Sequence, residues 1–324
     1  MEQITIVGQG LMGTCLAWRL HQRGLPFRLL DRDREQGSSR AAAGLITPIT
    51  GKGLNPSWRQ TEFLPQAIAF YEEIEAALGI KIWNPVAIAR LFGAEKERIK
   101  WEGKRCLESH RGWATDGALD LPSEIKAPLG GFLMRGGGWV NLPEFLDHSR
   151  GFFDKLGYFQ KVESFEGEQA EGSILINCRG AAELIEEGRP HRCAKGEILT
   201  VKIPGLGLKE IVNRSGWLVP LGDDAYRAGA TYGWDELDEN ATQAGLDDVR
   251  GIIRTFTDLP FEMIDHVAGI RPIVRQSIPV VSREGSCWNI NGLGSKGSMY
   301  APALASHIVE AMHNECSLDP ELRL

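Results

Sequence analysis

Residues 4–14 read ITIVGQGLMGT, and this stretch decides the fold class. Its first part is rich in β-branched apolar side chains, which predicts a short buried strand of a parallel sheet over residues 3–7. Three glycines follow in the G-x-G-x-x-G spacing, and residues 11–23 then carry apolar side chains at helical intervals. A strand that enters a helix through such a turn predicts the dinucleotide-binding unit of an α/β fold.

Each glycine of the turn has its own physical task in this prediction. Gly8 permits the tight turn, Gly10 lets the backbone approach a pyrophosphate, and Gly13 permits close packing of the helix on the strand. The helix begins at Leu11 and Met12, so its N-terminus faces the anion. These five residues are therefore predicted cofactor contacts.

A second predicted strand, residues 27–30, ends at an acidic residue, Asp31. A carboxylate at this position accepts hydrogen bonds from the ribose of an adenosine. The neighbouring Arg32 would suit a 2′-phosphate, but Asp31 would repel that group. We therefore expect Arg32 to be a surface charge or a neighbour of adenine.

The far end of the chain favours a longer cofactor than NAD. Residues 288–290 predict a strand, and NGLGSKGSMYAPALASHIVEAM, residues 291–312, predicts a second helix that opens on glycines. After Asp31, residues 32–58 are small and polar and lack the regular strand–helix alternation of a simple NAD domain. Two such helix N-termini suit FAD, with one beside the pyrophosphate and the other beside the flavin.

Several further motifs are spread over most of the chain. In chain order they are GSSRAAAGLITP (37–48), GGGWVNLPEFL (136–146), AKGEILTVKIPG (194–205), WLVPLGDDAYRAGATYGWDELDEN (217–240), GIRP (269–272) and GLGSKG (292–297). Their types and order resemble the D-amino-acid oxidase/glycine oxidase family of FAD-dependent oxidoreductases. Lys195 and Glu197 replace the Arg and Gln of the family's R-G-Q-x-L segment.

The resemblance implies an α/β fold, α+β overall, with a Rossmann-like FAD-binding domain of the glutathione-reductase type. A substrate domain, mostly an antiparallel β-sheet, is inserted into it. We expect the FAD-binding domain to comprise residues 1–80, 140–190 and 268–324, and the substrate-binding domain to comprise residues 81–139 and 191–267. Local patterns predict an amphipathic helix over 66–78, a buried strand over 172–181, and a hairpin that turns at Gly222–Asp223–Asp224.

The resemblance also implies further cofactor contacts. The whole predicted set is Gly8, Gly10, Leu11, Met12, Gly13, Asp31, Arg32, Ser38, Ser39, Ala43, Gly44, Leu45, Val162, Gly180, Gly294, Lys296, Gly297, Ser298 and Met299. We expect Gly44 to matter because a Cβ there would obstruct the flavin, and Val162 to offer backbone bonds to adenine. The helix from Gly297 would point its N-terminus at the flavin N1/C2=O edge. Lys296 is either a contact there or an exposed loop lysine.

On the substrate side, Arg271 of the GIRP motif is implied to bind a substrate carboxylate. Its alternative role is a structural ion pair with an internal Asp or Glu. Arg275 is a weaker candidate for the same role, and Trp217 and Tyr232 are either substrate-wall residues or aromatics packed in the sheet. His266 is the one histidine placed near this region. We expect neither a metal nor a nucleophile.

Some positions depart from the family pattern. Leu293 stands where many members have His, Gln276 where many have Asp, and Trp217 where the glycine-oxidase branch has Tyr. These departures bear on the substrate more than on the cofactor.

The resemblance implies FAD-dependent oxidation of a small amino acid or a secondary amine. As in the family, a hydride would pass from the α-carbon to flavin N5, and the imine would then hydrolyse. Two alternatives stay open, namely a flavoenzyme that modifies a larger substrate such as a tRNA base, and a flavin-binding protein without amine turnover. The electron acceptor is left open between oxygen and a quinone.

Composition is consistent with small-molecule partners. The chain of 324 residues carries a net charge of −7 and has no long Lys/Arg block, so we expect no nucleic-acid partner. Its six cysteines contain no C-x-x-C pair, and no apolar run is long enough to span a membrane. The first strand is predicted within five residues of Met1, so we expect no signal peptide and a cytoplasmic location.

Overall fold

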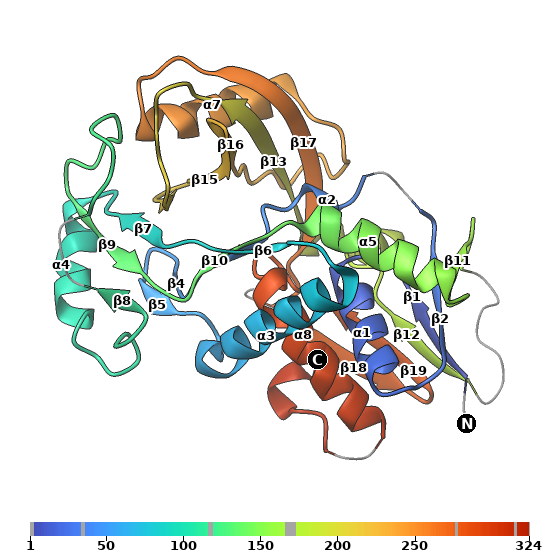
Figure 1. The fold of residues 1–324 in the computed structure, drawn as a ribbon. Coiled ribbons are helices and arrows are strands. Elements are labelled where there is room, and N and C mark those ends of the chain that lie inside the picture. The colour runs from blue at the N-terminus through green and yellow to red at the C-terminus, as the bar shows by residue number, and fades with distance from the viewer. Residues whose placement is uncertain are drawn as a thin grey trace.

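The computed structural model describes residues 3–33, 36–115, 119–165, 173–275, 278–313 and 316–323. Two large β-sheets make up its framework (Figure 1). The first has six strands in the order β11-β2-β1-β12-β19-β18. Their bounds are β1 Ile4–Val7, β2 Phe27–Asp31, β11 Phe159–Lys161, β12 Ile174–Asn177, β18 Val280–Glu284 and β19 Cys287–Asn291.

Five neighbouring strands of this sheet run parallel, and β18 is antiparallel at one edge. The glycine-opened helices predicted at the two ends of the chain both pack beside it. The helices of this part are α1 Leu11–Gln22, α3 Gln60–Leu78, α5 Leu142–Lys155, α6 Ala181–Glu186 and α8 Gly297–Met312. The predicted Rossmann-like unit is thereby confirmed.

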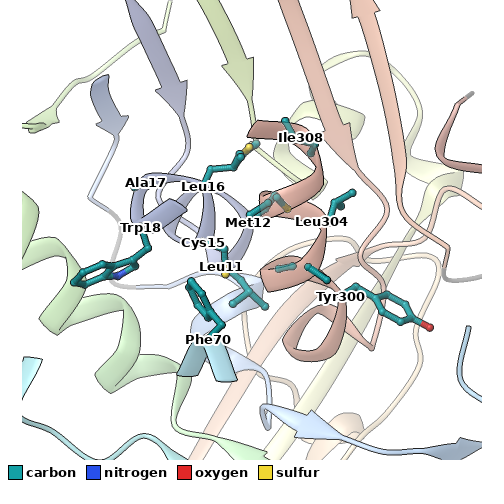
Figure 2. Close-up of a cluster of buried hydrophobic side chains, with 14 of the residues drawn as sticks. Leu11, Met12, Cys15, Leu16, Ala17, Trp18, Phe70, Tyr300, Leu304 and Ile308 are labelled. Carbon is teal, nitrogen blue, oxygen red and sulfur yellow. The ribbon is translucent and has the colours of Figure 1, made fainter. Parts of the chain in front are cut away.

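The largest hydrophobic core joins helices that are far apart in sequence. Figure 2 shows Leu11 and Cys15 of α1, Phe70 of α3 and Leu304 of α8 within one buried cluster. Each of these side chains is at most 5% exposed, and burial of such a side chain stabilises the fold by about 1.5–3 kcal/mol. This core therefore holds the two glycine turns in one place.

Helix α3 begins six residues earlier than the sequence predicted, at Gln60 rather than 66. Pro65 lies inside it and lacks the N–H for one helical hydrogen bond. Phe63 and Leu64, which precede that proline, are 4% and 2% exposed in the core. Their burial offsets the lost bond, a tertiary effect that local propensity does not contain.

The second sheet has eight strands in the order β17-β13-β16-β15-β14-β7-β9-β8. All neighbours are antiparallel except β14 and β7, which confirms a mostly antiparallel sheet. The strands are β7 Ile88–Leu91, β8 Ala114–Thr115, β9 Gly131–Met134, β13 Cys193–Lys202, β14 Ile211–Asn213, β15 Trp217–Gly222, β16 Ala225–Gly229 and β17 Glu262–Pro272.

The hairpin of β15 and β16 turns where the sequence predicted, with Asp223 and Asp224 both at positive φ. Helix α7, Gln243–Phe256, lies against this sheet (Figure 1).

Smaller elements lie between the two sheets or beside them. They are α2 Ser38–Ala41, β3 Leu45–Ile46, β4 Ile49–Thr50, β5 Asn55–Pro56, β6 Trp83–Pro85, α4 Glu95–Lys104, β10 Gly138–Val140 and the 3₁₀ turns Pro190–Arg192 and Pro320–Leu322. Strand β17 continues across the predicted boundary at residues 267 and 268. The division into an FAD-binding and a substrate-binding domain therefore remains a prediction. Within the described residues, no helix is both long and apolar enough to cross a membrane.

Candidate active site

A cavity of about 640 Å³ lies at the carboxyl ends of the parallel strands and reaches the eight-stranded sheet. Doubly wound sheets bind their ligands at this edge. Most predicted site residues line it, namely Gly8, Gly10, Leu11, Met12, Asp31, Arg32, Ser38, Ser39, Ala43, Gly44, Leu45, Gly180, Gly294, Gly297, Ser298, Trp217 and Arg271. Gly13, Val162, Lys296, Met299 and Tyr232 are outside this lining.

The turn between β1 and α1 is shaped by contacts of its glycines with protein atoms. Gly8 has φ +98°, and a Cβ there would lie 2.9 Å from the carbonyl oxygen of Cys178. A Cβ on Gly13 would lie 1.9 Å from the carbonyl oxygen of Gly8, which is the close packing that the sequence predicted. Gly10 keeps the backbone open toward the cavity, with Ser39 Oγ 3.2 Å from the position of its missing Cβ.

Two helix N-termini border the same cavity. The N-cap residues, Gly10 of α1 and Lys296 of α8, make no side-chain capping hydrogen bond, and neither helix has an acidic residue in its first turn. In α1 the N–H of Leu11 donates to Ser39 Oγ at 3.0 Å. The first residues of both helices, including Gly297, line the cavity. The other backbone N–H groups of each first turn and the positive end of each helix dipole favour an anion. The donor set therefore fits a pyrophosphate at α1 and an electron-rich flavin edge at α8.

The ribose-binding position predicted at Asp31 also borders the cavity. Its Oδ2 accepts a hydrogen bond from Gln9 N at 2.6 Å, and its Oδ1 accepts one from Asp33 N at 2.7 Å. Each carboxylate oxygen retains a further lone pair for a ribose hydroxyl. Arg32 pairs with Glu186 at 3.4 Å and lies over the Phe165 ring, 4.9 Å from its centroid. Its charge is thus already paired, which suits an adenine neighbour better than a 2′-phosphate site.

Sequence reasoning missed several residues at this end of the cavity, among them Gln9, Arg150, Phe165 and Arg179. The Nε of Arg150 donates to Gln9 Oε1 at 2.7 Å, and Arg150 also pairs with Asp33. Gln9 lies within a recognised motif, and Arg179 is adjacent to the predicted contact Gly180. Arg150 and Phe165 come from segments more than 100 residues from the first turn, so no local pattern pointed to them.

Gly44 has a steric requirement within the protein, in addition to the predicted one toward the flavin. Its φ is +70°, and a Cβ would lie 1.9 Å from the carbonyl oxygen of Val140 in β10. The protein backbone itself excludes a side chain there, whether or not a flavin lies on the other side. Val140 N donates to Gly44 O at 3.0 Å, which holds this part of the cavity wall against β10.

Some predicted cofactor contacts also make contacts within the protein. The N–H of Val162 donates to Asp31 O at 2.9 Å, so this group is already used within the protein. Lys296 Nζ donates to Thr50 Oγ1 at 2.9 Å, and burial lowers the pKa of its ammonium, so it is not the exposed loop lysine considered as an alternative. Met299 is 1% exposed in the core.

Arg271 lies in β17 and faces the cavity. Its Nη1 donates to the carbonyl oxygen of Thr231 at 3.1 Å, and its guanidinium lies 4.5 Å from the centroid of the Tyr232 ring. Burial lowers the pKa of Arg271, while Tyr232 acts in the opposite direction. Within the described part of the chain, no carboxylate forms an ion pair with it. The structural ion pair that was the alternative for Arg271 is thus missing among these residues.

The weaker substrate-side candidates lie at different places relative to the cavity. Trp217 lines the cavity, whereas Tyr232 is 54% exposed and contacts Arg271 from outside the lining. Arg275 donates to the backbone carbonyls of Glu321 and Arg323, which ties it to the C-terminal segment.

The remaining residues predicted near the substrate are His266, Leu293 and Gln276. His266 Nε2 lies 2.8 Å from Glu197 Oε2, away from the cavity lining. Leu293 lines the cavity, and Gln276 is outside the described residues.

Known proteins are similar to this chain along most of its length. The chain is 24% identical over 357 residues to the bifunctional protein ThiO/ThiG of Trichormus variabilis, covering 99% of this chain and 54% of that protein. It is 22% identical over 355 residues to the tRNA 5-methylaminomethyl-2-thiouridine biosynthesis bifunctional protein MnmC of Marinobacter nauticus, covering 95% and 55%. The chain thus spans about half the length of the curated relatives it matches.

Solved structures share the fold across nearly the whole chain. Glycine oxidase from Geobacillus kaustophilus superposes with a TM-score of 0.80 at 17% identity, covering 100% of this chain and 99% of that one. Iminodiacetate oxidase from Chelativorans sp. BNC1 gives a TM-score of 0.79 at 17% identity, covering 98% and 97%. The model of one family, described as FAD dependent oxidoreductase, matches residues 3–311. The chain therefore belongs to this family of FAD-dependent oxidoreductases, and FAD is its cofactor.

Proposed function

We propose that this protein oxidises a small amino acid or a secondary amine that carries a carboxylate. When bound, FAD would supply the acceptor, flavin N5, for a hydride from the α-carbon of the amine, and water would hydrolyse the imine product. The residues of the chain bind and orient the amine and hold the cofactor.

The observation that carries the proposal is the guanidinium of Arg271 in the cavity wall, which has no ion-pair partner among the described residues. A cation that has lost part of its hydration is costly to leave without an anionic partner. A substrate carboxylate supplies that partner and takes two parallel hydrogen bonds from the guanidinium fork. This fixes the α-carbon in one orientation, which is the positional requirement of hydride transfer.

Other groups support the same chemistry. No histidine is found in the described cavity lining, and a neutral amine needs no strong protein base to lose a hydride. The N-terminus of α8, with Gly297 and Ser298 in the lining, would stabilise negative charge on a flavin bound there. The names of the structural neighbours, glycine oxidase and iminodiacetate oxidase, describe enzymes for small carboxylated amines.

The test is the kinetics of Arg271→Ala against Arg271→Lys. We expect Arg271→Ala to lose about 3 kcal/mol of substrate binding, roughly 100-fold in KM, because two charge-assisted hydrogen bonds are removed. Arg271→Lys should recover part of this, since a point charge remains without the fork. The measurement is anaerobic flavin bleaching with amino acids and N-methyl amino acids.

An amine without a carboxylate serves as the internal control, because its KM should not respond to the substitution. The FAD content of each variant should equal that of the wild type. An unchanged KM for every carboxylated amine in Arg271→Ala would remove the carboxylate assignment.

A tRNA base is the second candidate substrate, because one relative is named for tRNA 5-methylaminomethyl-2-thiouridine biosynthesis. The net charge of −7 counts against it. A tRNA titration across a salt series would decide, since phosphate contacts give a steep salt dependence. Failure of every amine to reduce the flavin would instead favour a flavin-binding protein without amine turnover.

The electron acceptor is proposed to be oxygen or a quinone, which oxygen consumption and quinone-dye assays would distinguish. A cytoplasmic location remains a prediction from the sequence.

A further inference from the structure

The segment of residues 231–242 connects the end of β16 to the N-terminus of α7 and borders the substrate side of the cavity. Leu237, Asp238, Glu239 and Asn240 line the cavity directly. At the start of the segment, the carbonyl of Thr231 accepts the hydrogen bond from Arg271. One segment thus supplies both a wall of the cavity and the group that orients the arginine.

Lys195 of β13 holds the middle of this segment. Its side chain is 6% exposed, and its Nζ lies 2.6 Å from Asp238 Oδ1. The backbone of Lys195 also exchanges two hydrogen bonds with Gly233, at 2.8 and 2.9 Å. A buried ammonium requires its counter-ion, so the pair fixes Asp238, which is next to Glu239 in the lining.

Glu197, two residues further along β13, holds both ends of the segment. Its carboxylate is 5% exposed and accepts hydrogen bonds from the backbone N–H and the hydroxyl of Thr242, each at 2.8 Å. Its backbone N–H donates to Thr231 Oγ1 at 2.9 Å. Thr242 in turn caps α7 by accepting from Gly245 N at 2.9 Å. Glu197 therefore connects the start of the segment to the helix that ends it.

These two charged residues do not face the substrate side of β13. Successive side chains of a strand point to opposite faces, and Gly196 and Ile198 are the β13 residues in the cavity lining. Lys195 and Glu197 point to the other face, and they are also the two positions where the sequence departs from R-G-Q. Both side chains contact the 231–242 segment, and that of Glu197 also contacts His266 of β17. Their influence on the substrate is therefore indirect.

We propose that Lys195 and Glu197 are positioning residues for the substrate. They hold the 231–242 segment in place, so that Thr231 orients Arg271 and residues 237–240 close the wall against the bound amine. The inference rests on the proposed function, because it takes Arg271 as the group that binds the substrate carboxylate.

The first test replaces Lys195 with methionine, an uncharged side chain of similar volume. Lys195→Met should raise the KM of a carboxylated amine roughly tenfold and leave kcat within about twofold, since the reacting atoms are not touched. The Kd of benzoate, read from the perturbation of the flavin absorbance band, should rise by the same factor. The Kd of FAD should not change. Lys195→Arg should restore both values to within about threefold of the wild type.

The second test uses a matched pair in α7. A Cβ at Gly245 would lie 2.1 Å from Cδ of Glu197, whereas a Cβ at Gly251 has no atom within 4 Å. Gly245→Ala should therefore displace the Glu197 carboxylate and raise KM and the benzoate Kd. Gly251→Ala makes the same chemical change in the same helix and should keep wild-type values. If Lys195→Met does not fold, this pair carries the test.

The outcomes separate the two proposals. If Arg271→Ala leaves both KM and the benzoate Kd unchanged, the proposed carboxylate site fails. If Arg271→Ala weakens both while folded Lys195→Met and Gly245→Ala lower only the melting temperature, the positioning role is overturned and the proposed function stands. Equal effects of Gly245→Ala and Gly251→Ala would also overturn it.

Discussion

At the scale of single residues, the position of the Arg271 guanidinium depends on Gly196, which has no side chain. Arg271 pairs across the strands with Ala194, and its side chain extends over the neighbouring glycine of β13. A Cβ at Gly196 would lie 2.0 Å from Nη2 of Arg271. The strand thus leaves an opening that the guanidinium fills, which places the cation in the cavity wall.

Gly196→Ala is expected to displace the guanidinium without unfolding the protein, because the clash involves the far end of a flexible side chain. The KM of a carboxylated amine should rise roughly tenfold, with the flavin absorbance unchanged. In the Arg271→Ala background the same substitution should have little further effect, since the displaced group is gone. This double-mutant cycle is measured by anaerobic flavin-reduction kinetics of the wild type, Gly196→Ala, Arg271→Ala and the double variant. Fully additive effects would show that Gly196 acts independently of Arg271.

At the scale of elements, the close approach of two short strands positions one part of the cavity wall. Gly44 precedes β3 with φ +70°, and the carbonyl of Val140 in β10 occupies the space of its missing Cβ. The three-stranded sheet of β3, β10 and β6 therefore requires glycine here. The two residues that flank Gly44 in the chain, Ala43 and Leu45, also line the cavity.

Gly44→Ala should lower the free energy of unfolding by about 3 kcal/mol or more, because it combines a left-handed backbone with a backbone clash. Gly188 is the matched control, since it has the same φ of +70° and a Cβ added there would meet no atom within 4 Å. Gly188→Ala should cost only about 1–2 kcal/mol. Urea unfolding of both variants without FAD measures the difference. A similar loss of unfolding free energy in the two variants would mean that the backbone at Val140 shifts at little cost and that the clash does not destabilise the fold.

At the scale of the whole molecule, one cavity contacts both sheets. Gly8 and Asp31 come from the parallel sheet, and Trp217 and Arg271 come from the antiparallel one. A ligand that fills this cavity stabilises the arrangement of the two sheets, because it binds only the folded form.

FAD added to the apoprotein at about 100 times its Kd should raise the stability by about 2.7 kcal/mol. NAD at the same concentration should give a smaller shift, because it presents an ADP moiety to the α1 turn but no flavin to the N-terminus of α8. Thermal unfolding followed by circular dichroism makes the comparison. A larger shift with NAD than with FAD would contradict the assignment of the second helix N-terminus to the flavin.

Features that depend on local backbone conformation were predictable from the sequence alone. The β1–α1 turn requires glycines at set positions, and the β15–β16 hairpin turns at Asp223 and Asp224, whose short polar side chains tolerate positive φ. Helix α8 begins at Gly297 as expected. In each case residues adjacent in the chain carry the physical constraint, so their pattern was sufficient to predict these elements.

Contacts between distant segments were decided only by the tertiary structure. The sequence marked Gly44 as important but not for its clash with Val140, and it marked Arg271 without showing that no described carboxylate pairs with it. The ion pair of Lys195 with Asp238 joins residues 43 positions apart. The sequence by itself thus determined the cofactor-binding turns and the family. The tertiary structure decided which side chains meet around the cavity, because packing across the two sheets, rather than local periodicity, sets those distances.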